Sequence, residues 1–578
     1  MMRYKDLYFT AIYSLLLIIP DAPWIDDTIG RMPYGGLLLF NMLVYLSITF
    51  LLCYGIVFLR KIHKSVYCFI HTCLHIGLYT FSISNTFLFI FFSLRWDAFT
   101  LQLLEETNET ESIGFLETYI PTLNCCLLII GYIAICLIEY LLIKRNGKAS
   151  FYFPKLALLP LTTFTLYNGY FFTFDDYRVT YDITQKNNTL LMRNMLWKLN
   201  LSIQQYADEK EELEICAESQ KHVVIDSCTY KTKTIVVIIG ESYIKRHSSL
   251  YGYNKNTNPR LTQLQSDGDL NVFTDAISPR NGTSEAFKRF LSMAIDEDTT
   301  RKWCDTPLFP TIFKKAGYNV AFYSNQFVKE VEKDSRFNAG SGFFFHPGIE
   351  PYIFNERNHN KFEYDEELVK EYLKNRKKIE SAPYNLIIFH LLGQHVPYKD
   401  RYPPEFSLFS EKDYNERKEL STSQKREVAE YDNATSYNDF VVWQIMKMYQ
   451  NRDAIVIYFS DHGDECNDFR PHIGRAGDYV EAGRDVARCQ FDIPFLIYTP
   501  HLFRQNHPYL TKQIQESTNK PFNSDDLPHL LLYLAGIGVS DYLPTRNLID
   551  PSYNTKKKRY IGHEHNAEYN HFVKGNPE

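Results

Sequence analysis

The sequence predicts a protein in two parts: five membrane-spanning helices, then an α/β domain whose mostly parallel sheet has helices on both faces. Two observations support this prediction. Apolar segments crowd residues 1–174 of the 578-residue chain, and short apolar runs alternate with helix-length polar stretches after residue 231. A chain of this length also exceeds what one hydrophobic core usually holds, so more than one domain is expected.

Five apolar segments are expected to cross a membrane. Four of them reach the roughly 20 residues that a helix needs to span the hydrocarbon core. The first is shorter, but it lacks the small-residue cleavage site of a signal peptide. A single such segment also fits a buried helix of a soluble protein, whereas five in a row do not. The expected spans are residues 7–20, 36–59, 66–94, 121–143 and 151–174.

The charges between these segments predict the orientation of the chain. Lys and Arg gather at the amino terminus and after the second and fourth segments, whereas the loop after the third segment is acidic. Loops rich in Lys and Arg stay in the cytoplasm. We therefore expect the amino terminus inside and, after five crossings, everything beyond residue 174 outside. The basic residues are Arg3, Lys5, Arg60, Lys61, Lys64, Lys144, Arg145 and Lys148.

The rest of the chain has the pattern of a soluble protein. Residues 175–230 are polar and are expected to form a linker with amphipathic helices, in which the charged run 207–214 faces solvent. Continuous apolar runs separated by helix-length segments predict the mostly parallel sheet in residues 231–578. The strand candidates are TIVVIIG (234–240), NVAFYS (319–324), NLIIFHL (385–391), AIVIYFS (454–460) and PFLIYT (494–499).

Polar and ionisable side chains follow four of these strands. One such residue at a strand end is usually a cap or a turn residue, but four strands that deliver them to one sheet edge favour a functional site. Glu, Asp and neutral His are ligands of a zinc-like metal, which can polarise a phosphoryl oxygen. The residues are Glu241, Asn325, Lys329, His395, Asp461 and His462.

Two sequence motifs show which class of protein this arrangement of polar residues resembles. SDHGDE (460–465) resembles the metal-binding strand end of the alkaline-phosphatase and sulfatase superfamily. GES followed by SLYGYNKNTNP (249–259) resembles the membrane-bound phosphoethanolamine transferases, which modify lipid A and the lipopolysaccharide core. The resemblance implies a sulfatase-like catalytic domain over 231–578. It also implies a multi-pass protein of the bacterial inner membrane with that domain in the periplasm.

The resemblance also implies a threonine nucleophile, which we assign to Thr283 in DAISPRNGTSEAFKRFLS (275–292). A threonine hydroxyl needs a metal or a base to activate it. A helix that starts near Ser284 would aim its positive end at a phosphate. Ser284 is the competing nucleophile, and the alternative is that both residues only cap the helix.

Further roles follow from the same resemblance. The implied zinc ligands are Glu241, Thr283, Asp461 and His462. The implied ligands of the transferred phosphate are Asn325, Lys329, His395 and His472. Val396 replaces a glycine that the family carries after the first of these histidines, and His472 follows DHG at a slightly short spacing. A second zinc ion on the phosphate-site histidines is left open.

The acidic loop after the third segment is implied to contact the ethanolamine head group. Thr107 and Glu111 fit two positions of the family pattern Asn-x-x-x-Thr-x-x-x-Glu, but Leu103 stands where the asparagine is expected. An anionic Glu111 suits a cationic amine, and plain loop solvation is the alternative. The missing asparagine leaves the donor contacts open.

The implied reaction transfers phosphoethanolamine from phosphatidylethanolamine to lipopolysaccharide through a phospho-threonine. A core sugar and lipid A both stay open as acceptor, and the 241–259 segment favours the core. We expect a membrane-embedded monomer. The net charge of −6 gives no argument for nucleic-acid binding.

Three alternatives remain. A glycerophosphate transferase resembling lipoteichoic acid synthase is disfavoured by SLYGY. A sulfatase-like hydrolase is disfavoured because a Cys/Ser-x-Pro-x-Arg sequence is missing after the GES motif. A non-enzymatic scaffold would tolerate the loss of ligands that are all present here.

The eleven cysteines give less information about function than these motifs do. Six lie in or near the apolar segments and are expected to be packing residues. Proximity along the chain suggests disulfides between Cys216 and Cys228 and between Cys466 and Cys489.

Overall fold

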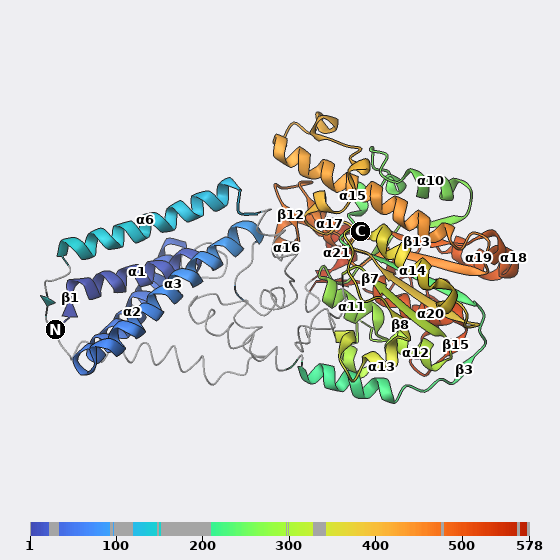
Figure 1. Cartoon of the computed structure of the whole chain (residues 1–578), viewed down its shortest axis with the longest axis horizontal. Coiled ribbons are helices and arrows are strands. Elements are labelled where there is room, and N and C mark those ends of the chain that lie inside the picture. Colours follow the sequence, from blue (N-terminus) through green and yellow to red (C-terminus); the bar gives the residue numbers. More distant parts are fainter. Residues whose placement is uncertain are drawn as a thin grey trace. The chain divides into compact units, whose positions relative to one another are not determined.

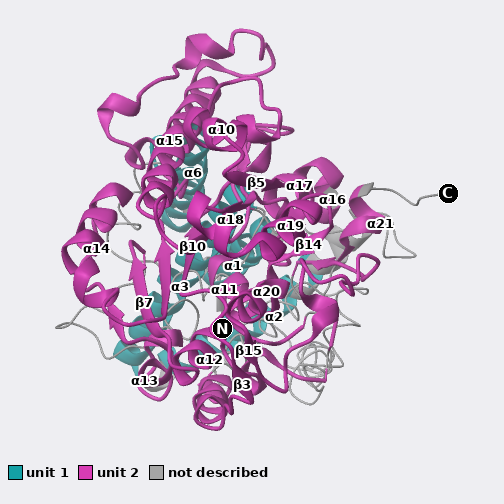
Figure 2. Ribbon diagram, turned by 90° about the vertical axis from the view of Figure 1, so that its right-hand side faces the viewer, with its two compact units in different colours: residues 1–207 teal, residues 208–578 magenta. Residues whose placement is uncertain are grey.

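The structure is a computed structural model of the chain. It describes residues 2–21, 34–92, 96, 119–146, 150–151, 208, 210–295, 297–298, 300–326, 343–475, 479–562 and 567–574. The chain forms two compact units, Met1–Ala207 and Asp208–Glu578 (Figure 2). The second unit begins inside the predicted linker, because the helix at residues 210–221 buries Leu213, Cys216 and Ala217 in the core of that unit.

The described part of the first unit is built from long helices (Figure 1). Each overlaps one of the first four apolar segments, and α1 packs against the other three. The fifth predicted segment, 151–174, lies almost wholly outside the described residues, as do Thr107 and Glu111. The helices are α1 (Tyr4–Asp21), α2 (Tyr34–Ile62), α3 (Lys64–Phe92) and α6 (Leu123–Asn146).

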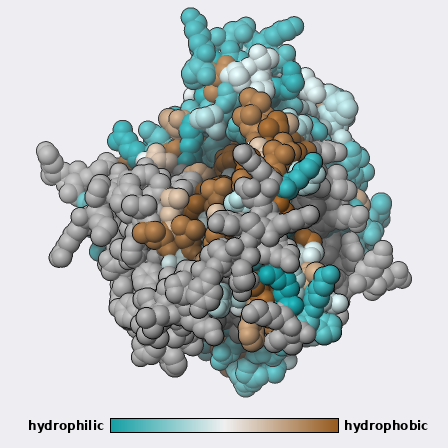
Figure 3. Space-filling model, turned by 90° about the vertical axis from the view of Figure 1, so that its left-hand side faces the viewer, coloured by the Kyte–Doolittle hydropathy of each residue, from teal (hydrophilic) through white to brown (hydrophobic). Residues whose placement is uncertain are grey.

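Two helices in the described part of the chain are long and apolar enough to cross a membrane, Lys64–Phe92 and Leu123–Lys144. The prediction of five spans is therefore not confirmed. Apolar side chains gather on the surface of this unit (Figure 3). Leu123, Ile130 and Ile133 of α6 are 72%, 61% and 61% exposed. Such a face is apolar where a helix in water would be polar.

The second unit is organised around a seven-stranded sheet with the order β5-β13-β10-β4-β9-β7-β8. Only β13 runs against its neighbours, so the predicted mostly parallel sheet is confirmed. All five strand candidates are present. The strands are β5 (Leu270–Phe273), β13 (Phe495–Tyr498), β10 (Ala454–Ser460), β4 (Thr234–Gly240), β9 (Asn385–His390), β7 (Asn319–Ser324) and β8 (Glu356–Arg357).

The prediction missed the two edge strands. β5 has only four residues, and β8 is the dipeptide Glu-Arg, so neither forms a continuous apolar run. Strands of this kind are recognised through their pairing partners rather than through their own composition.

Both faces of the sheet are covered by helices, as predicted. Ile235, Val237 and Ile239 of β4 belong to one buried cluster, whereas Val236 and Ile238 belong to another. Alternate side chains of a strand point to opposite faces, so β4 is buried on both. One face carries α11 (Thr283–Leu291), α12 (Phe309–Lys315) and α20 (Leu527–Ala535); the other carries α10 (Pro259–Ser266), α14 (Asp365–Ile379) and α15 (Thr422–Lys447).

The suggested disulfides are wrong, because all eleven cysteines are free thiols. Cys228 lies on β3 (Ser227–Cys228), which pairs with β15 (Ile537–Gly538). Cys216 lies near Cys304 instead, since Ser219 Oγ donates to the backbone carbonyls of both. Closeness along the chain therefore does not identify the spatial neighbour of Cys216.

Candidate active site

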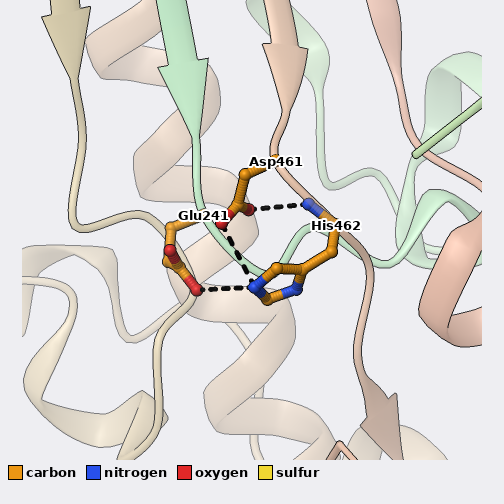
Figure 4. A group of neighbouring side chains, drawn as sticks. All are labelled: Glu241, Asp461 and His462. Atoms are coloured by element: carbon orange, nitrogen blue, oxygen red, sulfur yellow. Dashed lines mark hydrogen bonds and ion pairs between the residues drawn. The ribbon is translucent and has the colours of Figure 1, made fainter. Parts of the chain in front are cut away.

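The candidate site lies beyond the carboxyl ends of β4 and β10. Gly240 pairs with Ser460 in a parallel register, so the next residues, Glu241 and Asp461, leave neighbouring strands at the same level. Glu241, Asp461 and His462 are completely buried, and their ligand atoms lie within 4.8 Å of one another. Figure 4 shows the three side chains pointing toward a common centre.

The fourth predicted ligand, Thr283, joins this cluster from the first turn of α11. Its hydroxyl donates to Glu241 Oε2 at 3.2 Å and lies 3.1 Å from His462 Nε2. The helix cap is Gly282, and no side chain caps this end, so capping is not the role of Thr283. The Ser284 hydroxyl is buried without a hydrogen bond. The geometry therefore favours Thr283 over Ser284 as nucleophile.

Hydrogen bonding determines which nitrogen of His462 is available. Nδ1 lies 2.7 Å from the carbonyl oxygen of Gly463, which can only accept, so Nδ1 carries a proton. Nε2 is left to present its lone pair to the cluster. This arrangement, with one ring nitrogen bonded to a backbone carbonyl, is typical of metal-binding histidines.

The two carboxylates are oriented in a similar way. Asp461 Oδ1 accepts from the backbone N–H groups of Ser242 at 3.2 Å and His462 at 2.7 Å. Asp461 Oδ2 is buried, has no hydrogen-bond partner and lies 3.1 Å from His462 Nε2. Glu241 Oε1 lies 3.3 Å from the same nitrogen and accepts from the Ser242 hydroxyl.

These observations fit a zinc ion. An unpartnered buried carboxylate oxygen beside an imidazole lone pair costs free energy unless a cation lies between them. The three oxygen atoms stand 3.1–3.3 Å from Nε2. Ligands on a tetrahedral zinc with bonds of about 2.0–2.1 Å are separated by about 3.3 Å. One nitrogen and three oxygens are also donor types that zinc accepts.

The negative charge of the cluster governs its protonation. Burial works against the imidazolium, but the carboxylates of Asp461 and Glu241 raise the pKa of His462 to about 9. Burial and the charge of Glu241 raise the pKa of Asp461 to about 6. Burial opposes the charged form of Glu241 too, yet His462 holds its pKa well below the usual range. The cluster therefore attracts a cation to Nε2.

Of the predicted phosphate ligands, His395 lies close to the cluster. It follows β9, and its charge helps to lower the pKa of Glu241. Its Nδ1 donates to the carbonyl of Val396. The backbone N–H of Gln394 donates to the Glu241 carbonyl at 3.1 Å, so the loop that carries His395 packs on Glu241.

Asn325 and His472 are placed differently. The Asn325 amide donates to Asp365 and accepts from the Phe362 backbone, so it stabilises the loop after β7. His472 is half-buried in the turn between β11 (Glu465–Cys466) and β12 (Ile473–Gly474). Lys329 lies outside the described residues.

Two residues of the site were missed from the sequence. Gln326, beside Asn325, donates to Glu241 Oε2 at 3.0 Å and to the Leu391 carbonyl. Arg475 reaches His462 Nε2 with Nη1 at 2.7 Å. A cation three residues after His472 was the available signal for Arg475, but sequence alone does not tell which way the loop turns.

Comparison with known proteins agrees with this geometry. A family model described as Sulfatase matches residues 233–537, more than half of the chain. The chain belongs to the sulfatase family. The phosphoethanolamine transferase EptC of Escherichia coli is 31% identical over 343 residues, which are 58% of this sulfatase-family chain and 56% of EptC. The chain thus spans about half the length of the curated relatives it matches.

Similar solved structures include the following two. The C-terminal periplasmic domain of EptC from Escherichia coli, in a complex with zinc, has a TM-score of 0.51 at 27% identity and covers 61% of this chain and 98% of that one. The integral membrane protein lipooligosaccharide phosphoethanolamine transferase A of Neisseria meningitidis has a TM-score of 0.64 at 17% identity, over 95% and 98% of the two chains. The second likeness is one of fold alone. The predicted sulfatase-like fold of the catalytic domain is confirmed.

Proposed function

We propose that this chain transfers phosphoethanolamine from phosphatidylethanolamine to lipopolysaccharide, through a phosphorylated Thr283. The observation that carries the proposal is the position of the Thr283 hydroxyl, 3.2 Å from Glu241 Oε2 and 3.1 Å from His462 Nε2. A hydroxyl held against a buried cluster that fits zinc is suited to be a nucleophile. The relatives named phosphoethanolamine transferases support this choice of reaction.

The residues would hold one zinc ion through Glu241, Thr283, Asp461 and His462, and a second ion is left open. When bound, zinc supplies Lewis-acid stabilisation of the threonine oxygen and of the phosphoryl oxygens. The hydroxyl proton of Thr283 points at Glu241 Oε2, a carboxylate oxygen that can accept it. The amino terminus of α11 adds a partial positive charge beside the phosphate.

The reaction takes two displacements. In the first, Thr283 Oγ1 bonds to phosphorus, the P–O bond to diacylglycerol breaks, and diacylglycerol leaves as an alcohol with the proton that threonine lost. In the second, an oxygen of a hydroxyl or phosphate group on the acceptor bonds to phosphorus, the bond to Thr283 breaks, and the threonine oxygen takes up a proton, which a hydroxyl acceptor supplies itself. A covalent intermediate divides one difficult displacement into two easier ones.

We assign Lys329, His395 and His472 to the transferred phosphate, and Thr107 and Glu111 to the ethanolamine amine. Asn325 is assigned to the support of the phosphate site through the loop after β7, and its neighbour Gln326 is the residue that directly contacts Glu241. The acceptor is a core sugar or a lipid A group of lipopolysaccharide, and the motif at 241–259 favours the core.

The proposed protein is a multi-pass monomer of the bacterial inner membrane. Its domains are five helices in residues 1–174, a linker over 175–230 and a periplasmic catalytic domain over 231–578. Two helices long and apolar enough to cross a membrane support this proposal. The fold likeness to a solved integral membrane protein, over 95% of the chain, supports it as well.

The test is the first half-reaction. The full chain, purified in detergent, is incubated with fluorescent phosphatidylethanolamine. Intact-mass spectrometry then follows the phosphoethanolamine adduct while diacylglycerol release and bound zinc are measured. We expect Thr283→Ala to lose the adduct and diacylglycerol release. The matched control Ser284→Ala keeps both, because its hydroxyl makes no hydrogen bond in the cluster.

The outcomes separate the candidate functions. Zinc binding without an adduct in the unmodified chain contradicts the proposal. A glycerophosphate adduct formed from phosphatidylglycerol instead would favour the glycerophosphate transferase. Release of phosphoethanolamine to water without transfer to any glycolipid would favour a hydrolase.

A further inference from the structure

Arg475 connects the metal-binding cluster to the loop that carries the nucleophile. It directly follows β12 and is half-buried. Its Nη1 lies 2.7 Å from His462 Nε2 and donates to the backbone carbonyl of Asn281 at 3.1 Å. Asn281 stands two residues before Thr283. The guanidinium is therefore anchored beside the place where phosphorus must approach the threonine hydroxyl.

Arg475 and a metal ion compete for the same lone pair. Nδ1 of His462 carries a proton because it faces the Gly463 carbonyl, so in the neutral ring the only in-plane lone pair is on Nε2, and the 2.7 Å contact with the Arg475 donor describes that neutral ring. A guanidinium has donors and no acceptor and stays protonated, so its contact with Nε2 uses that lone pair. A zinc–imidazole bond of about 2.0–2.1 Å requires the same lone pair. Both cannot occupy it together.

We propose that Arg475 leaves His462 when the metal binds and then holds an oxygen of the transferred phosphoryl group, as a catalytic residue that touches substrate. The inference rests on the proposed function. The Asn281 carbonyl keeps the arginine at the site, because that contact does not involve the metal ligands. A planar guanidinium with several donors matches the oxygens of a phosphate.

The charges identify the class of ligand. A divalent metal ion would balance the carboxylates of Glu241 and Asp461, and Arg475, whose charge faces Glu241 and the buried Asp464, places a further cation beside it. Two cations this close repel one another unless an anion lies between them. A phosphodiester carries one negative charge and would be attracted to both cations. Phosphatidylethanolamine contains such a group.

The nearby Arg470 is less suited to this role. Its Nε and Nη2 bind both oxygens of the Glu465 carboxylate, at 2.7 and 2.6 Å. A bidentate pair of this kind fixes the guanidinium and cancels its charge. Arg475 instead contacts a ring nitrogen and a backbone carbonyl, so its guanidinium is not fixed in a bidentate pair, and its charge acts on Glu241 and Asp464 from a distance.

The test compares Arg475→Gln with the matched control Arg484→Gln in the full chain. Arg484→Gln makes the same change of charge nine residues away. The Arg484 side chain is 68% exposed, and its ion pair is with its neighbour Asp485. The first measurement is zinc affinity by chelator competition. We expect Arg475→Gln to bind zinc about tenfold more tightly, because a charged hydrogen bond that competes for His462 is gone, while Arg484→Gln is unchanged.

The second measurement is the rate of adduct formation from phosphatidylethanolamine at saturating zinc. We expect Arg475→Gln to be about a hundredfold slower, as when one donor to a transition-state oxyanion is removed. Arg475→Lys keeps the charge without the planar fork and should recover part of the rate. Circular dichroism of each variant checks that the fold is retained.

The inference predicts tighter zinc binding together with slower adduct formation. A site that is merely damaged would instead bind zinc more weakly and also form the adduct more slowly. Unchanged or weaker zinc binding in Arg475→Gln overturns the competition. Tighter zinc binding with an unchanged adduct rate overturns the role at the phosphoryl group. If the unmodified chain forms no adduct, the proposed transfer and the phosphoryl role both fail, and the zinc comparison still decides the competition.

Discussion

At the scale of single residues, Gly393 shows how closely the backbone packs around Glu241. Its φ is +53°, in the left-handed region, and a Cβ built there would lie 2.8 Å from the Glu241 carbonyl oxygen and 2.9 Å from its nitrogen. Both are backbone atoms at the end of β4. A side chain at residue 393 would therefore have to displace the proposed zinc ligand.

We predict that Gly393→Ala lowers zinc affinity by about tenfold or more. This is the usual size of the effect when a residue that orients a metal ligand is changed. Gly252→Ala is the matched control. Its φ of +94° imposes a similar backbone strain, but a Cβ there meets nothing within 4 Å. Chelator competition measures both affinities. Equal zinc affinities in the two variants would show that the contact with Glu241 does not matter.

At the scale of elements, the buried His247 connects three parts of the catalytic unit. It ends the short helix η3 (Lys245–His247). Its Nδ1 contacts Asp432 of α15 at 2.6 Å, and its Nε2 contacts Asp468 at 3.2 Å. Asp468 lies in the turn between β11 and β12, the hairpin that also carries His472 and leads to Arg475. One imidazolium thus fixes the hairpin against the helix that packs on the sheet.

His247 stabilises the fold in a pH-dependent manner. Burial opposes its charged form, but the carboxylates of Asp468 and Asp432 outweigh burial and raise the pKa of His247 to about 10. In the unfolded chain the pKa is about 6.5. A pKa raised by folding means that the stabilisation is complete below about pH 6.5 and is lost as the pH rises toward 10.

We predict that His247→Gln lowers the free energy of unfolding by about 3 kcal/mol at pH 6, because it leaves the fully buried Asp432 carboxylate without the imidazolium that it shares with the partly buried Asp468. The difference from the unmodified protein should shrink steadily between pH 6.5 and 10. Urea unfolding of residues 208–578 at several pH values measures it. The control His222→Gln removes a 75%-exposed imidazole and should change stability by no more than about 0.5 kcal/mol. A pH-independent difference would contradict the assignment of charge to His247.

At the scale of the whole molecule, the four proposed metal ligands and Arg475 all lie in the second unit, Asp208–Glu578. This unit has its own buried cores on both faces of the sheet. Its first helix, residues 210–221, contributes Leu213, Cys216 and Ala217 to one of them. The 210–221 part of the predicted linker therefore belongs to the folded core of the second unit.

We predict that residues 208–578 fold without the helical unit and bind zinc, while residues 231–578 unfold at lower urea concentration. Loss of the buried side chains of the 210–221 helix should cost about 2 kcal/mol or more. Urea midpoints and zinc content of the two chains test this prediction. Equal midpoints would mean that the helix is dispensable, and loss of zinc from residues 208–578 would mean that the first unit completes the site.

The sequence by itself determined the strands and the residues that follow them. TIVVIIG and AIVIYFS are apolar throughout, as strands buried on both faces must be, and their parallel pairing brings Glu241 and Asp461 to one edge. Burial and strand ends are local properties that appear directly in the residue pattern. Thr283 was assigned through family resemblance, and the structure places it in the cluster.

Only the tertiary structure decided how loops and distant segments meet. It placed Gln326 rather than Asn325 against Glu241, Cys216 beside Cys304, and Arg475 against His462. These contacts depend on turn conformation and on packing between segments far apart in the chain. A loop has no periodicity that shows where its side chains point, so the partners of its polar groups are set by whatever elements the folded core brings beside them.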